Sequence, residues 1–291
     1  MRAHLWKTLL IIAAALAIRE VTAAPRSGKV IYGNDDRVDY FEITDAKLKS
    51  AADSTVALLR AANLNQIGAT TYINTVSYGQ SMGLCPAEAF YNQETAAFCS
   101  GFLVGPDLVV TAGHCITDQA SCMNTKMVFG FKLADKDSMP RSVPTNNVYS
   151  CLRVIHSVSA PTGEDFAVVK LDRPVADFIP LAYRTTGKIN VGEALHVIGH
   201  PAGLPLKIAG GGEVRTVQSE FLVANLDTYG GNSGSAVFNS VTGEVEGVLV
   251  RGERDFIFEN GCRSSNRCPD KGCRGEDVTL FERVIPYLKG N

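Results

Sequence analysis

The sequence from Tyr229 to Phe238 reads YGGNSGSAVF, a polar turn with several glycines that runs directly into an apolar strand. A serine hydroxyl acts as a nucleophile only with a base beside it and with donors ready for the oxyanion. Glycines allow the backbone to aim two N–H groups at one point. We therefore take Ser233 as a candidate nucleophile and the N–H groups of Gly231 and Ser233 as a candidate oxyanion hole. By itself the stretch is also typical of an ordinary turn.

A second stretch, CSGFLVGPDLVVTAGHC from Cys99 to Cys115, places a histidine directly after an apolar strand. The two stretches together resemble the trypsin-like serine endopeptidases. The family's Thr-Ala-Ala/Gly-His-Cys motif stands here as Thr111–Cys115, and its Gly-Asp/Asn-Ser-Gly motif as Gly231–Gly234. Asn232, in place of an aspartate before the serine, is similar to the glutamyl-endopeptidase branch. The resemblance extends over about residues 30–288 and implies that His114 is the catalytic base.

The third member of such a triad is a carboxylate that orients the histidine. In the trypsin-like order it lies between the histidine and the serine, at the start of a buried apolar strand. Asp165, followed by FAVVKL, fits this pattern. Glu164 is its nearest rival, but Asp165 is the residue directly before the apolar run. The resemblance therefore implies the triad His114, Asp165 and Ser233.

Composition excludes several other function classes. The chain has 291 residues and a formal net charge of −2, which gives no electrostatic reason to expect nucleic-acid or membrane binding. Its five histidines do not show the spacing of a zinc motif with its cysteines. We expect no metal, no cofactor and a monomer.

The N-terminus predicts export. Arg2, His4 and Lys7 precede the apolar run Leu9–Ala17, which is too short to span a bilayer and is typical of a signal peptide. Small residues at 22–24 predict cleavage near Ala23 or Ala24, so residues 1–24 are the expected signal peptide. The mature protein is expected to be secreted and extracellular.

Eight cysteines in an exported chain predict a disulfide framework. The resemblance implies a Cys99–Cys115 bridge. Cys122 and Cys151 could close a loop. Cys262, Cys268 and Cys273 crowd one late loop, so one of them must pair elsewhere, most simply with Cys85. The sequence leaves the pairing of these six cysteines open.

The residues after the signal peptide predict a zymogen with a very short propeptide. Residues 25–29, PRSGK, precede VIYGNDDR at Val30–Arg37, which resembles the mature start of glutamyl endopeptidases. An ordinary frayed terminus is the alternative. Because Asn232 is neutral, the new amine cannot pair with an aspartate at that position, as it does in pancreatic-type trypsins.

Short apolar runs separated by turn residues predict an all-β fold of two six-stranded antiparallel Greek-key barrels with a C-terminal helix. The N-terminal barrel is expected over about 30–172 and the C-terminal barrel over about 180–291, with 173–180 as the connection. Residues 42–65 are expected to be helical or irregular. Separate strands are expected at 206–209 and 212–218, and the resemblance implies a terminal helix packed on the second barrel.

The specificity pocket gives conflicting signals. Alignment from Ser233 places Asp227 and Thr228 on one wall and Val250, Arg251 and Gly252 on the other. In trypsins an aspartate at the Asp227 position pairs with Lys or Arg, whereas Thr228 matches the glutamyl branch. Leu249 stands where that branch uses a histidine. A buried carboxylate repels an acidic side chain, so we expect cleavage after Lys or Arg, and glutamyl specificity is the alternative.

The sequence therefore predicts a secreted serine endopeptidase that hydrolyses protein or peptide substrates through an acyl-enzyme. A non-catalytic protease homologue that serves as a binding module is the hypothesis from a different class.

Overall fold

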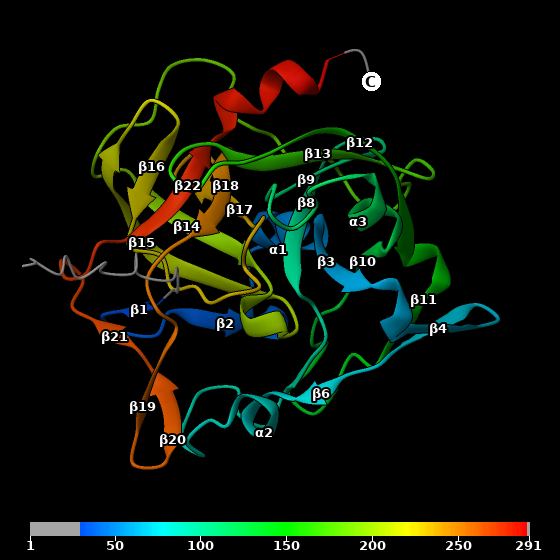
Figure 1. Ribbon diagram of the computed structural model, residues 1–291, viewed down its shortest axis with the longest axis horizontal. Coiled ribbons are helices and arrows are strands. Elements are labelled where there is room, and N and C mark those ends of the chain that lie inside the picture. Colours follow the sequence, from blue (N-terminus) through cyan, green and yellow to red (C-terminus); the bar gives the residue numbers. More distant parts are fainter. Residues whose placement is uncertain (1–29, 290–291) are drawn as a thin grey trace, which may run out of the picture.

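The computed structural model describes residues 30–289 (Figure 1). The expected signal peptide and propeptide lie outside these residues. Two antiparallel β-barrels lie side by side, as the sequence predicted. Among the described residues, no helix has the length and apolar character needed to cross a membrane.

The first barrel closes through six strands in the spatial order β10-β12-β13-β9-β8-β3. They are β3 (Thr55–Arg60), β8 (Cys99–Gly105), β9 (Leu108–Thr111), β10 (Thr125–Phe129), β12 (Val148–Ser159) and β13 (Asp165–Leu171). Strand β3 falls inside the stretch expected to be helical or irregular. The helical parts of that stretch are α1 (Ala46–Asp53) and a 3-10 turn at Ala61–Asn63. Val56 to Leu59 are all fully buried, so the strand lacks the apolar–polar alternation that identifies a half-buried strand.

The second barrel contains β14 (Ala194–Gly199), β15 (Lys207–Val217), β16 (Phe221–Ala224), β17 (Ala236–Asn239), β18 (Val245–Arg251) and β22 (Glu276–Leu280). Pairing of β14 with β15 closes it. The two strands expected at 206–209 and 212–218 form the single strand β15. The run Gly210–Gly212 resembles a turn in the sequence. In the structure Gly211 has a φ of +70° inside the strand, and a Cβ on Gly212 would lie 2.5 Å from Leu226, so glycine is required there.

Several shorter elements lie outside the two barrel sheets. They are the sheet of β4 (Leu64–Ile67), β5 (Thr70–Ile73) and β11 (Ser142–Pro144), the pair β6 (Val76–Ser77) and β7 (Glu94–Thr95), the hairpin β19 (Phe256–Glu259) and β20 (Cys262–Ser265), and the short helices α2 (Tyr78–Met82) and α3 (Gln119–Met123).

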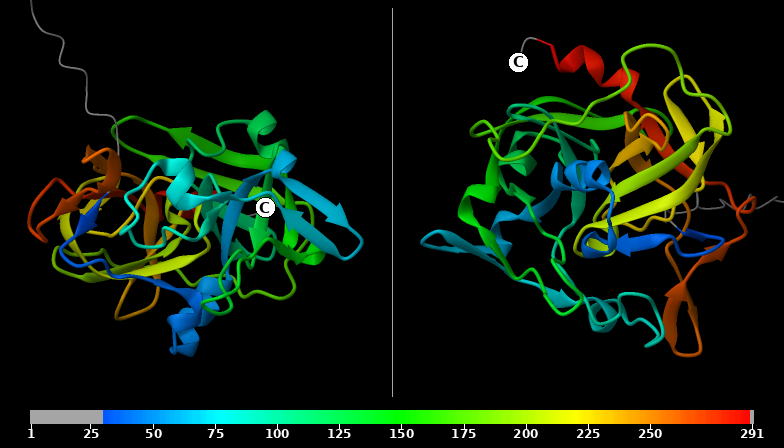
Figure 2. Two further views of the ribbon diagram at one scale, coloured as in Figure 1. Left: turned by 90° about the horizontal axis from the view of Figure 1, so that it is seen from below. Right: turned by 180° about the vertical axis from the view of Figure 1, so that it is seen from behind.

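The N-terminal segment belongs in space to the second barrel, which differs from the expected boundary at residue 30. Strand β1 (Ile31–Tyr32) pairs with β21 (Arg267–Cys268), and β2 (Arg37–Asp39) extends the second barrel beside β15. Figure 2 shows this dark blue segment against the yellow and orange strands. Buried Lys207 on β15 secures the contact with Asp39 at 2.5 Å and with Gln93 at 2.8 Å.

The C-terminal segment makes the reciprocal contact. Its expected helix is present as two consecutive 3-10 turns, Phe281–Arg283 and Ile285–Tyr287. The first turn contacts β18 of the second barrel, as expected. The segment also contacts the first barrel: Phe281 contacts Phe102 of β8, and Tyr287 stacks on His156 of β12 with ring centroids 3.7 Å apart. Each end of the described chain therefore contacts the barrel that is more distant in sequence.

Four disulfides link Cys85–Cys262, Cys99–Cys115, Cys122–Cys151 and Cys268–Cys273. The bridge implied by the resemblance is among them. Cys85–Cys262 closes the longest loop, with a sequence separation of 177. It joins the loop after α2 to the hairpin β19–β20.

Loop closure predicts unequal effects of removing these bridges. The Cys85→Ala/Cys262→Ala variant is expected to lose about 5 kcal/mol in the free energy of unfolding on the chain-entropy relation. The matched control is Cys268→Ala/Cys273→Ala, whose cysteines lie only 5 residues apart; it is expected to lose about 2 kcal/mol. Urea denaturation at neutral pH measures both. Equal losses would show that local packing, not loop closure, sets the contribution of these bridges.

Candidate active site

The candidate histidine and aspartate meet at the junction of the barrels. Asp165 opens β13, and its Oδ2 lies 2.8 Å from His114 Nδ1. Its Oδ1 accepts the backbone N–H of His114 at 3.1 Å. Asp165 is buried and His114 is exposed. Two contacts to one carboxylate therefore fix both the ring and the backbone of the histidine.

Strand β22 holds the carboxylate's own backbone in place. The hydroxyl of Thr279 accepts the N–H of Asp165 and donates to its carbonyl, both at 3.2 Å. This contact crosses from the second barrel to the first. A buried polar backbone group without such a partner would destabilise the fold.

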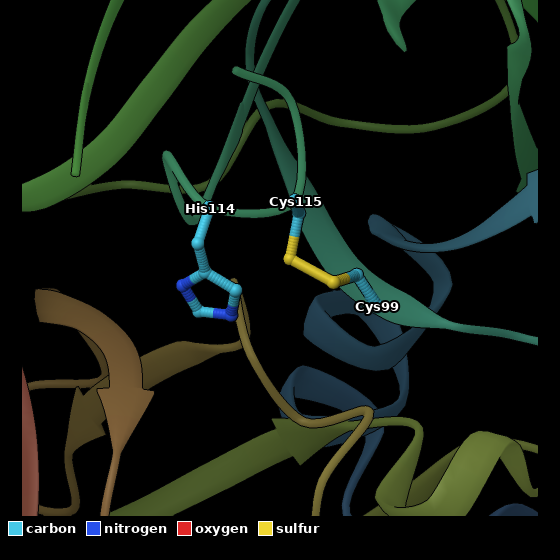
Figure 3. Close-up of side chains that lie close together, drawn as sticks. All are labelled: Cys99, His114 and Cys115. Atoms are coloured by element: carbon cyan, nitrogen blue, oxygen red, sulfur yellow. A yellow bond between two sulfur atoms is a disulfide. The ribbon is translucent and has the colours of Figure 1, made fainter. Parts of the chain in front are cut away.

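Ser233 lies beside the histidine loop. Its hydroxyl donates to the Val250 carbonyl at 3.4 Å, and its carbonyl oxygen lies 3.7 Å from the sulfur of Cys115, the residue after His114. Figure 3 shows the His114 ring on the same loop as the Cys99–Cys115 disulfide. The structure thus joins His114 to Asp165 directly and places the turn that carries Ser233 beside the loop that carries His114.

The turn that carries Ser233 is clamped by the first barrel. Ser100 of β8 donates its backbone N–H to the Ser233 carbonyl at 2.9 Å, and its hydroxyl donates to the Gly231 carbonyl at 2.8 Å. Gly234 has a φ of +90°, and a Cβ there would lie 2.1 Å from the Ser100 carbonyl. The sequence analysis did not identify Ser100, because a serine within a strand has no distinguishing signal.

A hydrogen bond from Ala202 orients the peptide group between Gly230 and Gly231, which carries one of the two candidate oxyanion donors. Gly231 has a φ of +94°. The Gly230 carbonyl accepts the N–H of Ala202 at 2.5 Å. In a trans peptide the carbonyl and the following N–H point in opposite directions, so this bond directs the Gly231 N–H away from Ala202. Ala202 itself has a φ of +52°, a conformation that costs a residue with a Cβ about 1 kcal/mol.

The carboxylate of Asp227 has partners that the sequence analysis did not foresee. Its Oδ1 accepts the N–H of Tyr32 at 2.7 Å, and its Oδ2 accepts the N–H of Asp36 at 2.8 Å. Asp227 is buried. Both oxygens of Asp227 therefore anchor the N-terminal segment.

Glu276, which the sequence analysis missed, lies between the two segments expected to form the pocket. It is fully buried. Its Oε2 accepts from the Thr228 hydroxyl at 3.0 Å, and its Oε1 accepts from Glu253 N at 3.3 Å. A Cβ on Gly252 would lie within 2.3 Å of all three atoms of this carboxyl group. No motif marks Glu276, because only the fold places β22 against Thr228 and Gly252.

Arg251 was expected to line the pocket, and the structure turns its guanidinium toward Asp165 and Asp277 instead. Val250 contributes its carbonyl to Ser233 and is otherwise buried. The atoms of His114, Cys99 and Cys115 that could bind a metal lie within 4.8 Å of one another, but both sulfurs are oxidised in a disulfide. A metal site requires thiolates, so this group does not fit one.

The comparisons with known proteins agree with this fold. A chymotrypsin-fold serine protease is the class that they define. A family model described as a trypsin-like peptidase domain matches residues 99–248, more than half of the chain, and the chain belongs to this family.

Individual relatives point to the same class. Glutamyl endopeptidase of Bacillus licheniformis is 31% identical over 148 residues, which cover 48% of this chain and 45% of that protein. The chain spans between 23% and 57% of the length of three curated relatives that it matches.

Two solved structures share the fold. The structure of a Glu endopeptidase in complex with MPD has a TM-score of 0.51 at 19% identity and covers 90% of this chain and all of that chain. The Vibrio cholerae VesB protease has a TM-score of 0.51 at 15% identity and covers 88% of this chain and 67% of that chain.

The burial of Asp227 predicts a pH dependence. Desolvation raises the pKa of Asp227 from 3.8 to about 7, and the two backbone N–H donors only partly oppose it. Between these values the folded protein holds a proton that the unfolded chain has released. This contribution to the free energy of unfolding is therefore full below about pH 4 and is lost as the pH rises through 7.

An Asp227→Asn variant lacks this titration. The difference in unfolding free energy, wild type minus variant, is expected to fall by on the order of 3 kcal/mol from pH 4 to pH 7.5. Urea denaturation at several pH values measures this difference, in which the other titrating groups cancel. Parallel curves for the two proteins would contradict the assignment.

Proposed function

We propose that this chain is a secreted serine endopeptidase with the triad His114, Asp165 and Ser233. The observation that supports it most is the pair of contacts from the Asp165 carboxylate to the ring and the backbone of His114, beside a serine on a turn with two positive-φ glycines. Ser233 attacks the substrate carbonyl while His114 takes its proton, which forms a tetrahedral intermediate. His114 then gives the proton to the leaving amine, the C–N bond breaks, and the acyl-enzyme that remains is hydrolysed by water.

Two N–H groups complete the proposed chemistry. Those of Gly231 and Ser233 stabilise the oxyanion of the tetrahedral intermediate. Asp165 keeps the His114 ring oriented and stabilises the imidazolium. The disulfides support an extracellular location. The substrates are proteins or peptides, as for the protease relatives.

The proposal includes processing after Lys29. Val30 is fully buried, and its carbonyl accepts the N–H of Thr228 at 3.3 Å. A chain end at Val30 would thus lie beside the segment that leads to Ser233. Residues 25–29 form the proposed propeptide.

A fluorophosphonate probe tests the triad and the processing together. The secreted protein is expected to be labelled, and Ser233→Ala is expected to abolish labelling, because the probe reacts only with an activated serine. Ser235→Ala is the matched control, since that serine lies two residues away on the same turn. N-terminal sequencing of the labelled band is expected to read Val-Ile-Tyr-Gly.

Two results would contradict these steps separately. A folded, processed protein that is not labelled would favour the non-catalytic binding module. A labelled protein that starts at Ala24 or Pro25 would reject processing after Lys29 and leave the triad in place.

For specificity we propose cleavage after Lys or Arg, with the acidic group supplied by Glu276 and not by Asp227. The support is the position of the Glu276 carboxylate against Thr228 and Gly252. A desolvated carboxylate there favours a cationic side chain and disfavours an acidic one. The glutamyl endopeptidase relative supports the alternative, cleavage after Glu.

A peptide library decides between these specificities. Glu276→Gln is expected to lower kcat/KM at least tenfold for peptides with Lys or Arg before the scissile bond, because the charge pair is lost. It should change little for small apolar residues at that position. Asp227→Asn serves as the comparison and is expected to affect all peptides alike. Wild-type cleavage after Glu would overturn the proposed specificity.

A further inference from the structure

The side chain of Arg251 contacts Asp165 and several groups that surround it. At the end of β18, its Nη1 lies 3.6 Å from Asp165 Oδ2, and its Nε donates to Asp277 Oδ2 at 3.0 Å. Its Nη1 also donates to the Ala160 carbonyl at 3.0 Å, and its Nη2 donates to the Gly163 carbonyl. Arg251 is thus bound to the loop that leads into Asp165 as well as to Asp165 itself.

Arg251 and His114 contact the same oxygen of the Asp165 carboxylate. Asp165 Oδ2 is also the atom that contacts His114 Nδ1. The side chain of Asp165 is only 6% exposed and that of Arg251 only 14%, so water screens this ion pair weakly. A buried carboxylate without a positive partner loses its hydration at a large cost. Arg251 supplies that partner when the neighbouring imidazole is neutral.

We propose that Arg251 is a positioning residue that holds the Asp165 carboxylate aimed at His114, and that the pH dependence of the proposed activity therefore depends on Arg251. The proposal rests on the proposed function for its kinetic consequence. Its physical basis is that a positive charge on Asp165 Oδ2 opposes formation of the adjacent imidazolium. Arg251 therefore extends the range of activity toward lower pH.

Other charged groups surround this contact and have partners of their own. Arg274 pairs with Asp277 Oδ1 at 2.5 Å, on the side away from Asp165. Arg283 pairs with Glu164, next to Asp165. On β12, His156 stacks on Tyr287, and on β22 the carboxylate of Glu276 lies against Gly252. Among the ion pairs of residues 30–289, Asp165 is paired with His114 and with Arg251.

The same geometry argues against a direct contact between Arg251 and substrate. Each of its three nitrogens already lies within bonding reach of a carboxylate or a carbonyl of the protein. A guanidinium held in this way presents no free edge for a bidentate contact with a substrate carboxylate. The expected role in the specificity pocket is thus replaced by a role behind the triad.

The test compares pH profiles of kcat/KM for purified processed enzyme. Arg251→Gln is expected to move the acid limb upward by about half to one pH unit and to lower kcat at pH 6, with KM changed less than twofold. Arg274→Gln is the matched control, because it also removes a cation from Asp277 but does not touch Asp165. Its acid limb is expected to coincide with that of wild type.

Two more variants keep the test decisive if Arg251→Gln does not fold. Arg251→Lys preserves the charge and is expected to keep the acid limb while it loses stability. Asp277→Asn frees Arg251 from its second carboxylate and is expected to move the acid limb to lower pH. An unchanged acid limb in Arg251→Gln, or shifts of Arg251→Gln and Arg274→Gln that are equal, would overturn the proposal. If Arg251→Gln leaves the acid limb unchanged and raises KM, Arg251 contacts the substrate and the proposal is also overturned.

A measurement without catalysis separates this proposal from the proposed function. In the Ser233→Ala background, the pH midpoint of the His114 imidazole resonance is followed by NMR, with His114→Ala for assignment. Arg251→Gln is expected to raise this midpoint by the same half to one pH unit. If peptidase activity fails to depend on Ser233, this result still tests the link from Arg251 to His114. If the midpoint does not move, the link is rejected even in an active enzyme.

Discussion

The hydrogen bonds from Ser100 to the Ser233 turn are the constraint on which the arrangement of the site depends. They run from a strand of the first barrel to the carbonyl groups of Gly231 and Ser233 on the second. The contact between Thr279 and the Asp165 backbone runs in the opposite direction. Each barrel therefore positions a candidate catalytic residue that belongs to the other. A shift of one barrel relative to the other would disturb nucleophile and carboxylate together.

Burial explains why the charged groups behind the site form a connected set. Asp165, Asp277 and Arg251 lie where water is scarce, and each buried charge there requires an opposite one. The buried carboxyl group of Asp227 has backbone N–H groups as its partners in place of a cation. The result is a site whose carboxylates have distinct roles: one orients the histidine, one anchors the N-terminal segment, and Glu276 lies behind Gly252.

The sequence predicts those parts of the molecule whose chemistry requires residues at fixed short spacing. The turn around Ser233, the motif that ends at Cys115 and the start of β13 at Asp165 could be located because each combines a reactive side chain with a local backbone pattern. The partners of Asp227 could not, because Tyr32 lies 195 residues away and only the fold joins them. The direction of Arg251 was missed for a related reason, since its choice between pocket and triad depends on where β22 places Asp277. Strand β3 was missed because burial on both faces removes the alternation that identifies a strand.

The position of the N-terminal segment on the second barrel also has a consequence for the order of folding. Strands β1 and β2 are synthesised first, yet Asp39 meets Lys207 across 168 residues, and β1 pairs with β21 near the end of the chain. The first barrel uses strands from β3 to β13 and can close while the second is still being made. The segment must then wait as an unpaired edge until the last strands form, and contacts of such high sequence separation form slowly. The first of the described strands to be made are thus the last to be placed, and Asp227 stays without its backbone donors until that step.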